Sequence, residues 1–133
     1  MSLKLVRTDT GATAIEMLHA ATTIWSRFVG LQFRSGLPNT HGLLIVPCSS
    51  IHTMFVRFAL DVFFISKDGM VTEVRREVRP WKIALPKKKA HAVLETSAGA
   101  IELEAGTHVC IKSTTAKLPA SLRFLAGSEE MTC

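Results

Sequence analysis

The chain has 133 residues, of which 47% are hydrophobic and 20% are charged. This length and composition predict a single domain with one hydrophobic core, and they exclude an intrinsically disordered chain. The net charge of +5 permits an anionic partner, but it does not identify one because the basic residues are spread along the chain. We expect residues 1–126 to form the domain and residues 127–133 to form a loose tail.

The sequence also bounds location, metals and disulfides. No apolar stretch reaches the about 18 residues that a membrane-spanning helix needs, and the N-terminus lacks the apolar segment of a signal peptide. A cytoplasmic location is predicted for the chain as it stands, and a periplasmic or secreted one if a native leader has been removed. The cysteines, Cys48, Cys110 and Cys133, lack zinc-binding spacing, so no metal or cofactor is predicted. A Cys48–Cys110 disulfide would need an oxidising compartment.

The first third of the chain is predicted to form a hairpin followed by a helix. Residues 3–8 alternate between apolar and polar, which predicts a strand, and a turn with Gly11 follows. Residues 13–20 favour helix by composition, but their closeness to the turn favours the second arm of a hairpin. Residues 24–33 are predicted to form a helix capped by Thr22 or Thr23.

The middle of the chain is predicted to be β-rich. Residues 43–47 form an apolar strand that Pro47 ends, and residues 50–55 form another. Asp68-Gly69 lies between the alternating runs 61–66 and 70–78, a strong hairpin signal. In the second arm, one face is predicted to carry Met70, Thr72, Val74 and Val78, and the other Glu73, Arg75 and Glu77.

The C-terminal part is predicted to contain three more strands. They cover residues 92–96, 101–105 and 107–112, and glycines separate them. No element is predicted for the last twenty residues.

Several motifs occur together in a fixed order. They are GLxxRxxL from Gly30 to Leu37, IHTMFVRFALDVFF at 51–64, KDG at 67–69, Pro80-Trp81, AVLE at 92–95, and glycines at 99 and 106. From about Ala20 to Lys112 the chain therefore resembles the Domain of Unknown Function 192 family. The resemblance implies a β-dominated α+β fold, with a curled, barrel-like, mostly antiparallel sheet and one short helix. The family has no established biochemical activity, so the resemblance implies no function.

Residues 51–64 place ionisable side chains in an apolar run. Ten of these fourteen residues are apolar, and burying a charge among them is costly unless it finds a partner. A turn near residues 56–60 would allow Asp61 to accept backbone hydrogen bonds or to pair with Arg57 or Arg34. In a structural interpretation these contacts only hold the turn. In a functional one, Arg34, Arg57 and Asp61 line a pocket for a small polar or anionic ligand.

His52 is the candidate catalytic residue, because its ordinary pKa is close to neutrality. A hydrolase-like enzyme would use His52 with Asp61 or Glu95, although no nucleophile motif is present. Glu95 can also be interpreted as an exposed strand residue. A metal site would need His52 to meet His19, His41 and His91, and we do not predict one.

Two more features have a structural and a functional interpretation. Trp81 could cover the core or stack on a ligand. Lys87–Lys89, with Arg75, Arg76 and Arg79, could contact nucleic acid, but the aromatic residues lie in apolar runs rather than beside the basic ones. The prediction is therefore a binding or interaction module with a site formed by Arg34, His52, Arg57, Asp61, Glu95 and Trp81. The hydrolase and then the nucleic-acid binder are the alternatives, and the oligomeric state is left open.

Overall fold

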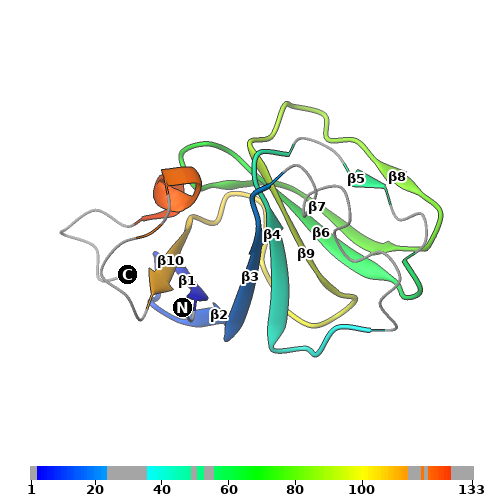
Figure 1. Ribbon diagram of the computed structural model, residues 1–133, viewed down its shortest axis with the longest axis horizontal. Coiled ribbons are helices and arrows are strands. Elements are labelled where there is room, and N and C mark those ends of the chain that lie inside the picture. The colour runs from blue at the N-terminus through cyan, green and yellow to red at the C-terminus, as the bar shows by residue number, and fades with distance from the viewer. Residues whose placement is uncertain are drawn as a thin grey trace.

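The computed structural model describes residues 3–23, 36–48, 51–52, 56–113, 118 and 120–126. This part of the chain is mostly β-strand, with one short 3-10 helix near its end (Figure 1). In chain order the elements are β1 (Leu3–Arg7), β2 (Thr13–Ile15), β3 (Met17–Ala21), β4 (His41–Ile45), β5 (Ile51–His52), β6 (Leu60–Ile65), β7 (Val71–Val78), β8 (Ile83–Ala84), β9 (Ala92–Ser97), β10 (Val109–Ser113) and η1 (Ala120–Leu125).

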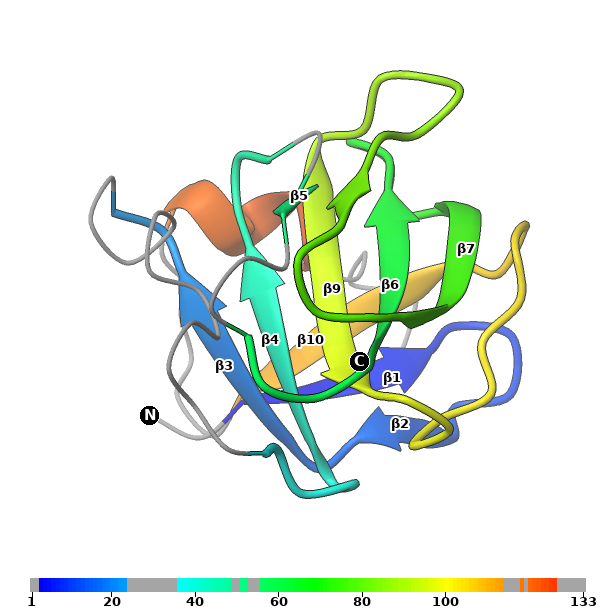
Figure 2. The same cartoon turned by 90° about the vertical axis from the view of Figure 1, so that its right-hand side faces the viewer.

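The strands form three sheets. A three-stranded sheet has the order β10-β1-β2, a five-stranded sheet has the order β3-β4-β9-β6-β7, and β5 pairs with β8. All pairings are antiparallel except that of β3 with β4. Figure 2 shows the five-stranded sheet in front of β1, β2 and β10. The β-dominated fold is confirmed, but a barrel-like sheet is not supported, because none of the sheets among the described residues closes on itself.

The three inner strands of the five-stranded sheet, β4, β9 and β6, are buried on both faces. Leu44, Phe63 and Leu94 point into a first core, which they share with β1, β2, β10 and η1. Their neighbours Leu43, Phe64 and Val93 point into a second core on the other face, where Ala84 of β8 also packs. Strands buried on both faces need continuous apolar sequence, which explains the runs LLIV and VFFI.

The hairpin of β6 and β7 forms as predicted, with Gly69 in its turn at a φ of 86°. The predicted faces of its second arm hold only between two bulges in β7. One lies near Thr72, because Phe64 is opposite Glu73 whereas Ile65 is opposite Val71. The other lies at Glu77, whose φ is 52°, because Val62 is opposite Arg75 whereas Leu60 is opposite Val78. Val74 consequently packs against the first core and Val78 against the second, because a bulge reverses the alternation beyond it.

Four other predictions have different outcomes. Residues 13–20 are split, since β2 completes the hairpin with β1 while β3 joins the five-stranded sheet. The strand predicted at residues 101–105 is wrong, because residues 101–104 form no ladder. The helix predicted at residues 24–33 lies outside the described residues. Cys48 forms no disulfide, so the Cys48–Cys110 bridge is absent. No described helix is long and apolar enough to cross a bilayer.

Candidate functional site

Asp61 is completely buried in β6, and its carboxylate is fully engaged. Its Oδ1 accepts a hydrogen bond from the backbone N–H of Glu77 at 2.9 Å, in the bulge of β7. Its Oδ2 accepts one from the N–H of Gly99 at 2.9 Å, in the turn after β9, and another from Nη1 of Arg76 at 2.8 Å. The carboxylate therefore joins three segments of the chain, and a guanidinium compensates the charge that burial would otherwise penalise.

The partner of Asp61 corrects the sequence analysis. Arg76 forms the ion pair, whereas Arg57 is exposed and makes no contact with Asp61 among the described residues. Arg34 lies outside the described residues. Counting from the turn would not have identified Arg76, because equal counting along both arms from Asp68 places Arg75 opposite Asp61, and the extra residue in β7 near Thr72 shifts the register by one.

Arg76 is held in place by more than Asp61. Its Nη1 also donates to the carbonyl of Ile101 at 2.9 Å, and its Nη2 donates to Glu102 at 3.3 Å. The guanidinium carbon lies 5.5 Å from the centre of the Phe63 ring, a cation–π distance. About a third of the side chain stays exposed, at 37%. Arg76 is therefore a cation that is fixed before any ligand arrives.

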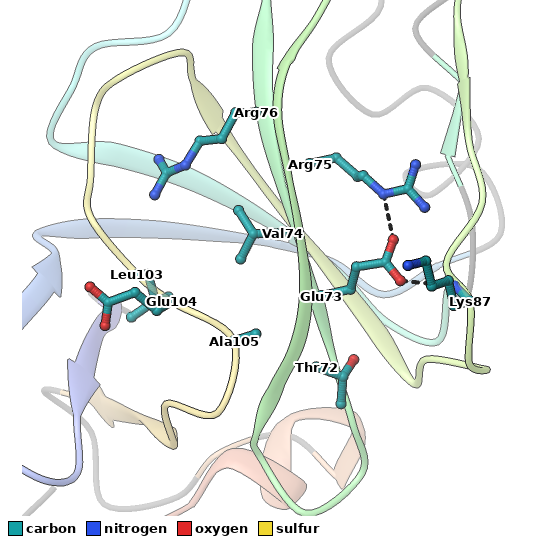
Figure 3. A pocket seen from close by; sticks show the side chains of 9 residues that line it. All are labelled: Thr72, Glu73, Val74, Arg75, Arg76, Lys87, Leu103, Glu104 and Ala105. Carbon is teal, nitrogen blue, oxygen red and sulfur yellow. Dashed lines mark hydrogen bonds and ion pairs between the residues drawn. The ribbon is translucent and has the colours of Figure 1, made fainter.

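Arg76 lines a groove that follows β7, the edge strand of the five-stranded sheet (Figure 3). The groove has a volume of about 710 Å³. Its apolar lining comes from Val74, Leu103 and Ala105, and its other lining residues are Thr72, Glu73, Arg75, Arg76, Lys87 and Glu104. A smaller hollow of about 240 Å³ adjoins it and shares Thr72, Glu73 and Lys87 with it.

A second fixed cation, Arg75, points to the side of β7 opposite Arg76 (Figure 3). Arg75 donates through Nε to the Glu73 carboxylate and through Nη2 to the carbonyl of Leu85 at 2.9 Å. Glu73 also accepts a hydrogen bond from the N–H of Lys87 at 2.9 Å. This backbone N–H and, next, the Arg75 guanidinium lower the pKa of Glu73. Figure 3 shows these three side chains on one side of β7 and residues 103–105 on the other.

Glu95 is the second buried carboxyl group. It lies in β9 between Leu43 and Val62 on the flanking strands, so it faces the second core. Only 3% of Glu95 is exposed, and no hydrogen bond to it occurs among the described residues. Burial raises its pKa to about 8. Glu95 is therefore mainly protonated at neutral pH, and it is not the exposed strand residue of one interpretation.

The remaining predicted site residues are not brought together within the described part of the chain. The side chain of His52 lies outside the description, and Trp81 is 61% exposed on the surface rather than a lid on the core. Of the predicted residues whose side chains the structure describes, Arg57, Asp61, Trp81 and Glu95, none lines the groove at β7. Sequence analysis therefore missed the groove, whose apolar lining comes from Leu103 and Ala105 in the segment predicted to be a strand.

The histidines considered as metal ligands do not all lie at one place in the fold. His19 and His41 lie on adjacent strands, with their ring nitrogens 3.0 Å apart. His91 instead packs edge-on against Phe124, with ring centres 4.7 Å apart. No group of three metal-binding side chains occurs among the described residues.

The sequence and the fold both have known relatives. Residues 5–111 match the family model DUF192, described as an uncharacterized ACR. The chain belongs to the DUF192 family. Among its members, a UPF0127 protein from Pyrococcus furiosus is 32% identical over 57% of this chain and 67% of its own length. One from Thermococcus sibiricus is 34% identical over 62% of this chain and 55% of its own length. The match thus spans about half to two thirds of these relatives.

Two solved structures share the DUF192 fold seen here. A crystal structure from Sinorhizobium meliloti, described as a candidate transcription regulator, has a TM-score of 0.69, is 22% identical and covers 80% of this chain and 89% of its own. A protein of unknown function from Novosphingobium aromaticivorans has a TM-score of 0.69 at 19% identity, over 82% of this chain and 83% of its own. These likenesses establish the fold alone.

Proposed function

We propose that this DUF192 protein is a binding module, and that the groove along β7 holds a small molecule with an anionic group and an apolar part. The observation that carries the proposal is Arg76, which is held in place on the side of β7 where Leu103 and Ala105 line the groove, while Arg75 is held in place on the other side. A cation that is already fixed loses little conformational entropy when it binds, so the affinity is not spent on ordering it. Asp61 has the role of a positioning residue, since it orients Arg76.

The charges in the groove favour an anionic ligand over a cationic one. Glu73 is compensated by Arg75 and by the Lys87 N–H, and Asp61 compensates Arg76 from the interior. The ammonium group of Lys87 adds a further positive charge, and Glu104 adds a negative one. The donor groups therefore suit a carboxylate or phosphate, while Val74, Leu103 and Ala105 suit an apolar portion.

A titration monitored by amide NMR tests this function. Phenyl phosphate is the probe, because it combines a dianion with an aromatic ring, and inorganic phosphate is the comparison without the apolar part. We expect phenyl phosphate to shift amide signals of β7 and residues 103–105. Lys87→Gln should weaken binding by about tenfold, because a hydrogen bond to a charged group contributes roughly 1.5 kcal/mol, and its backbone contact to Glu73 is retained.

Arg57→Gln is the matched control, because Arg57 is an exposed cation from the site predicted by sequence. Its affinity for phenyl phosphate should equal that of the wild-type chain. A loss of binding in Arg57→Gln but not in Lys87→Gln would place the ligand near Arg34, His52 and Arg57 instead, and would refute the groove as the site. An absence of shifts at millimolar probe would refute the proposed ligand class.

A further inference from the structure

Exposed apolar side chains gather on one segment, which we call the β8 arm (residues 80–89). Four large hydrophobic residues stand out as exposed among the described ones, and three of them lie in this arm. They are Trp81, Ile83 and Leu85, each more than 60% exposed. Between them Ala84 points inward and is 3% exposed, as expected for strand alternation. A cluster of this kind in a ten-residue segment differs from scattered surface hydrophobics, which need no explanation.

The arm is held against the domain, so its apolar side chains project from a fixed support. Ala84 pairs with Ile51 of β5 on one side. On the β7 side, Arg75 donates to the carbonyl of Leu85 at 2.9 Å, and the N–H of Lys87 donates to Glu73 at 2.9 Å. Figure 1 shows β8 beside β5 at the periphery of the molecule, outside β6 and β7. Folding of the arm onto the core therefore does not hide these side chains.

The same arm is strongly basic. It contains four exposed lysines and no carboxylate, so all its charged side chains are positive. The lysines are Lys82, Lys87, Lys88 and Lys89. Apolar side chains that project from a lysine-rich surface match the interface of an anionic bilayer, where Trp prefers the headgroup level and lysines attract acidic lipids.

We propose that the β8 arm docks this protein on the surface of an anionic lipid bilayer, a function separate from ligand binding in the groove. Trp81, Ile83 and Leu85 enter the headgroup region, and Lys82, Lys88 and Lys89, which do not line the 710 Å³ groove, contact lipid phosphates. The shape of the arm favours a bilayer over a protein partner. Its apolar side chains project outward instead of lining a groove for a helix, and its strand has two residues, too few to add a partner strand.

Co-sedimentation with vesicles tests the proposal. The vesicles contain phosphatidylcholine either alone or with one quarter phosphatidylglycerol. We expect binding to the anionic vesicles that falls steeply when the salt concentration rises from 0.05 to 0.5 M, as screening requires. Lys88→Gln with Lys89→Gln should weaken binding by about 25-fold, at about fivefold per lysine. Ile83→Ser with Leu85→Ser should weaken it by tenfold or more.

Met17→Ser is the matched control, because Met17 is 48% exposed on β3, outside the arm. It should bind the anionic vesicles like the wild-type chain. The chain has two tryptophans, so Trp25→Phe leaves Trp81 as the only reporter, and its emission should shift to the blue with anionic vesicles. Circular dichroism shows whether each variant is folded.

Three results would overturn the proposal. They are equal binding to neutral vesicles, an equal loss of binding in Met17→Ser and the arm variants, and an unchanged Trp81 emission in the presence of sedimenting vesicles. A change of oligomeric state in Ile83→Ser with Leu85→Ser, without any vesicle binding by the wild-type chain, would assign the arm to self-association instead. A failure of phenyl phosphate binding in the groove leaves this experiment unaffected, since the vesicle assay does not use that probe.

Discussion

Asp61 and Glu95 are both buried carboxyl groups, yet their surroundings give them opposite properties. Asp61 accepts three hydrogen bonds, one of them from the Arg76 guanidinium. Glu95 lies between Leu43 and Val62 and has no such donor among the described residues. The Asp61 carboxylate therefore stabilises the fold through its three contacts, whereas the ionised form of Glu95 destabilises the fold.

The pKa of Glu95 predicts a specific pH dependence of stability. Its pKa is about 8 in the folded protein and about 4.5 in the unfolded chain, so between these values the folded state binds the extra proton. Stability then falls as pH rises from about 4.5 to 8, and changes no further above that range. Replacing Glu95 with Gln should remove this dependence, since a neutral amide of the same size has no charge to bury.

Urea unfolding of both proteins between pH 4 and 9 checks this prediction. The two free energies of unfolding should differ least at the acid end of this range, and the advantage of Glu95→Gln should then grow to several kcal/mol near pH 8. Glu16→Gln, at an exposed residue before β3, is the control. Parallel curves for wild-type and Glu95→Gln would show that Glu95 is not desolvated in the folded state.

At the level of single residues, the sequence predicted only part of the site. The cost of burying Asp61 in an apolar run indicated that it needs partners, and that structural interpretation agrees with its contacts. Its cation was missed because Arg57 is nearer in sequence, while Arg76 is nearer in the hairpin register. The burial of Glu95 depends on how two other strands flank β9, and a single-strand pattern carries no information about that.

At the scale of elements, the hairpin of β6 and β7 was predictable because its signals are local. Asp-Gly fixes the turn, and alternation fixes the strands. The bulge at Glu77 was not predictable from alternation, since it depends on the Asp61 carboxylate binding the Glu77 N–H. Residues 101–105 alternate like a strand, but their contacts with β7 are made by the Arg76 side chain and the Gly106 N–H rather than by a ladder.

The turn at Gly69 yields a prediction for this element. Gly69 has a φ of 86°, and a Cβ there would lie 3.1 Å from the carbonyl oxygen of Val109. Gly69→Ala should therefore cost about 2 kcal/mol or more, from backbone strain plus displacement of β10. Gly11→Ala is the control, with a φ of 74° but no atom within 4 Å of its Cβ, and should cost only about 1 kcal/mol.

Thermal and denaturant unfolding of the two variants measures this difference. The larger loss in Gly69→Ala isolates the effect of the contact with β10, since both positions share the left-handed backbone. Equal losses would mean that β10 moves away without cost, and that the turn of the hairpin is not packed tightly against it.

At the scale of the whole molecule, the β-rich character followed from the spacing of strand and turn signals and the α+β class from the resemblance to the DUF192 family, but the division into sheets followed from neither. Whether strands close into a barrel depends on pairings between residues that are far apart in the sequence. The parallel pairing of β3 with β4 and the separate sheet of β5 and β8 are of this kind. Local patterns determine the elements here, and long-range packing determines how they pair.

The arrangement of layers predicts which backbone amides are best protected. β6 and β9 each have a strand on both sides and a core on both faces, so their amides should exchange hydrogen only through global unfolding. Amides of Leu85, Lys88 and Lys89 should exchange through local opening, at least a hundredfold faster, whereas Ile83 and Ala84 pair with β5 and the Lys87 amide is bonded to Glu73. Exchange measured by NMR checks this order, and equal rates in β9 and the β8 arm would contradict it.

The pairing of β1 with β10 also affects how the chain is made. Leu3 is opposite Ser113, so one edge of the first strand stays open until the residues of β10 have left the ribosome. Before then β1 can form only its hairpin with β2, and the first core cannot close. We therefore expect nascent chains to expose Leu5 and Ile15 until β10 has been synthesised.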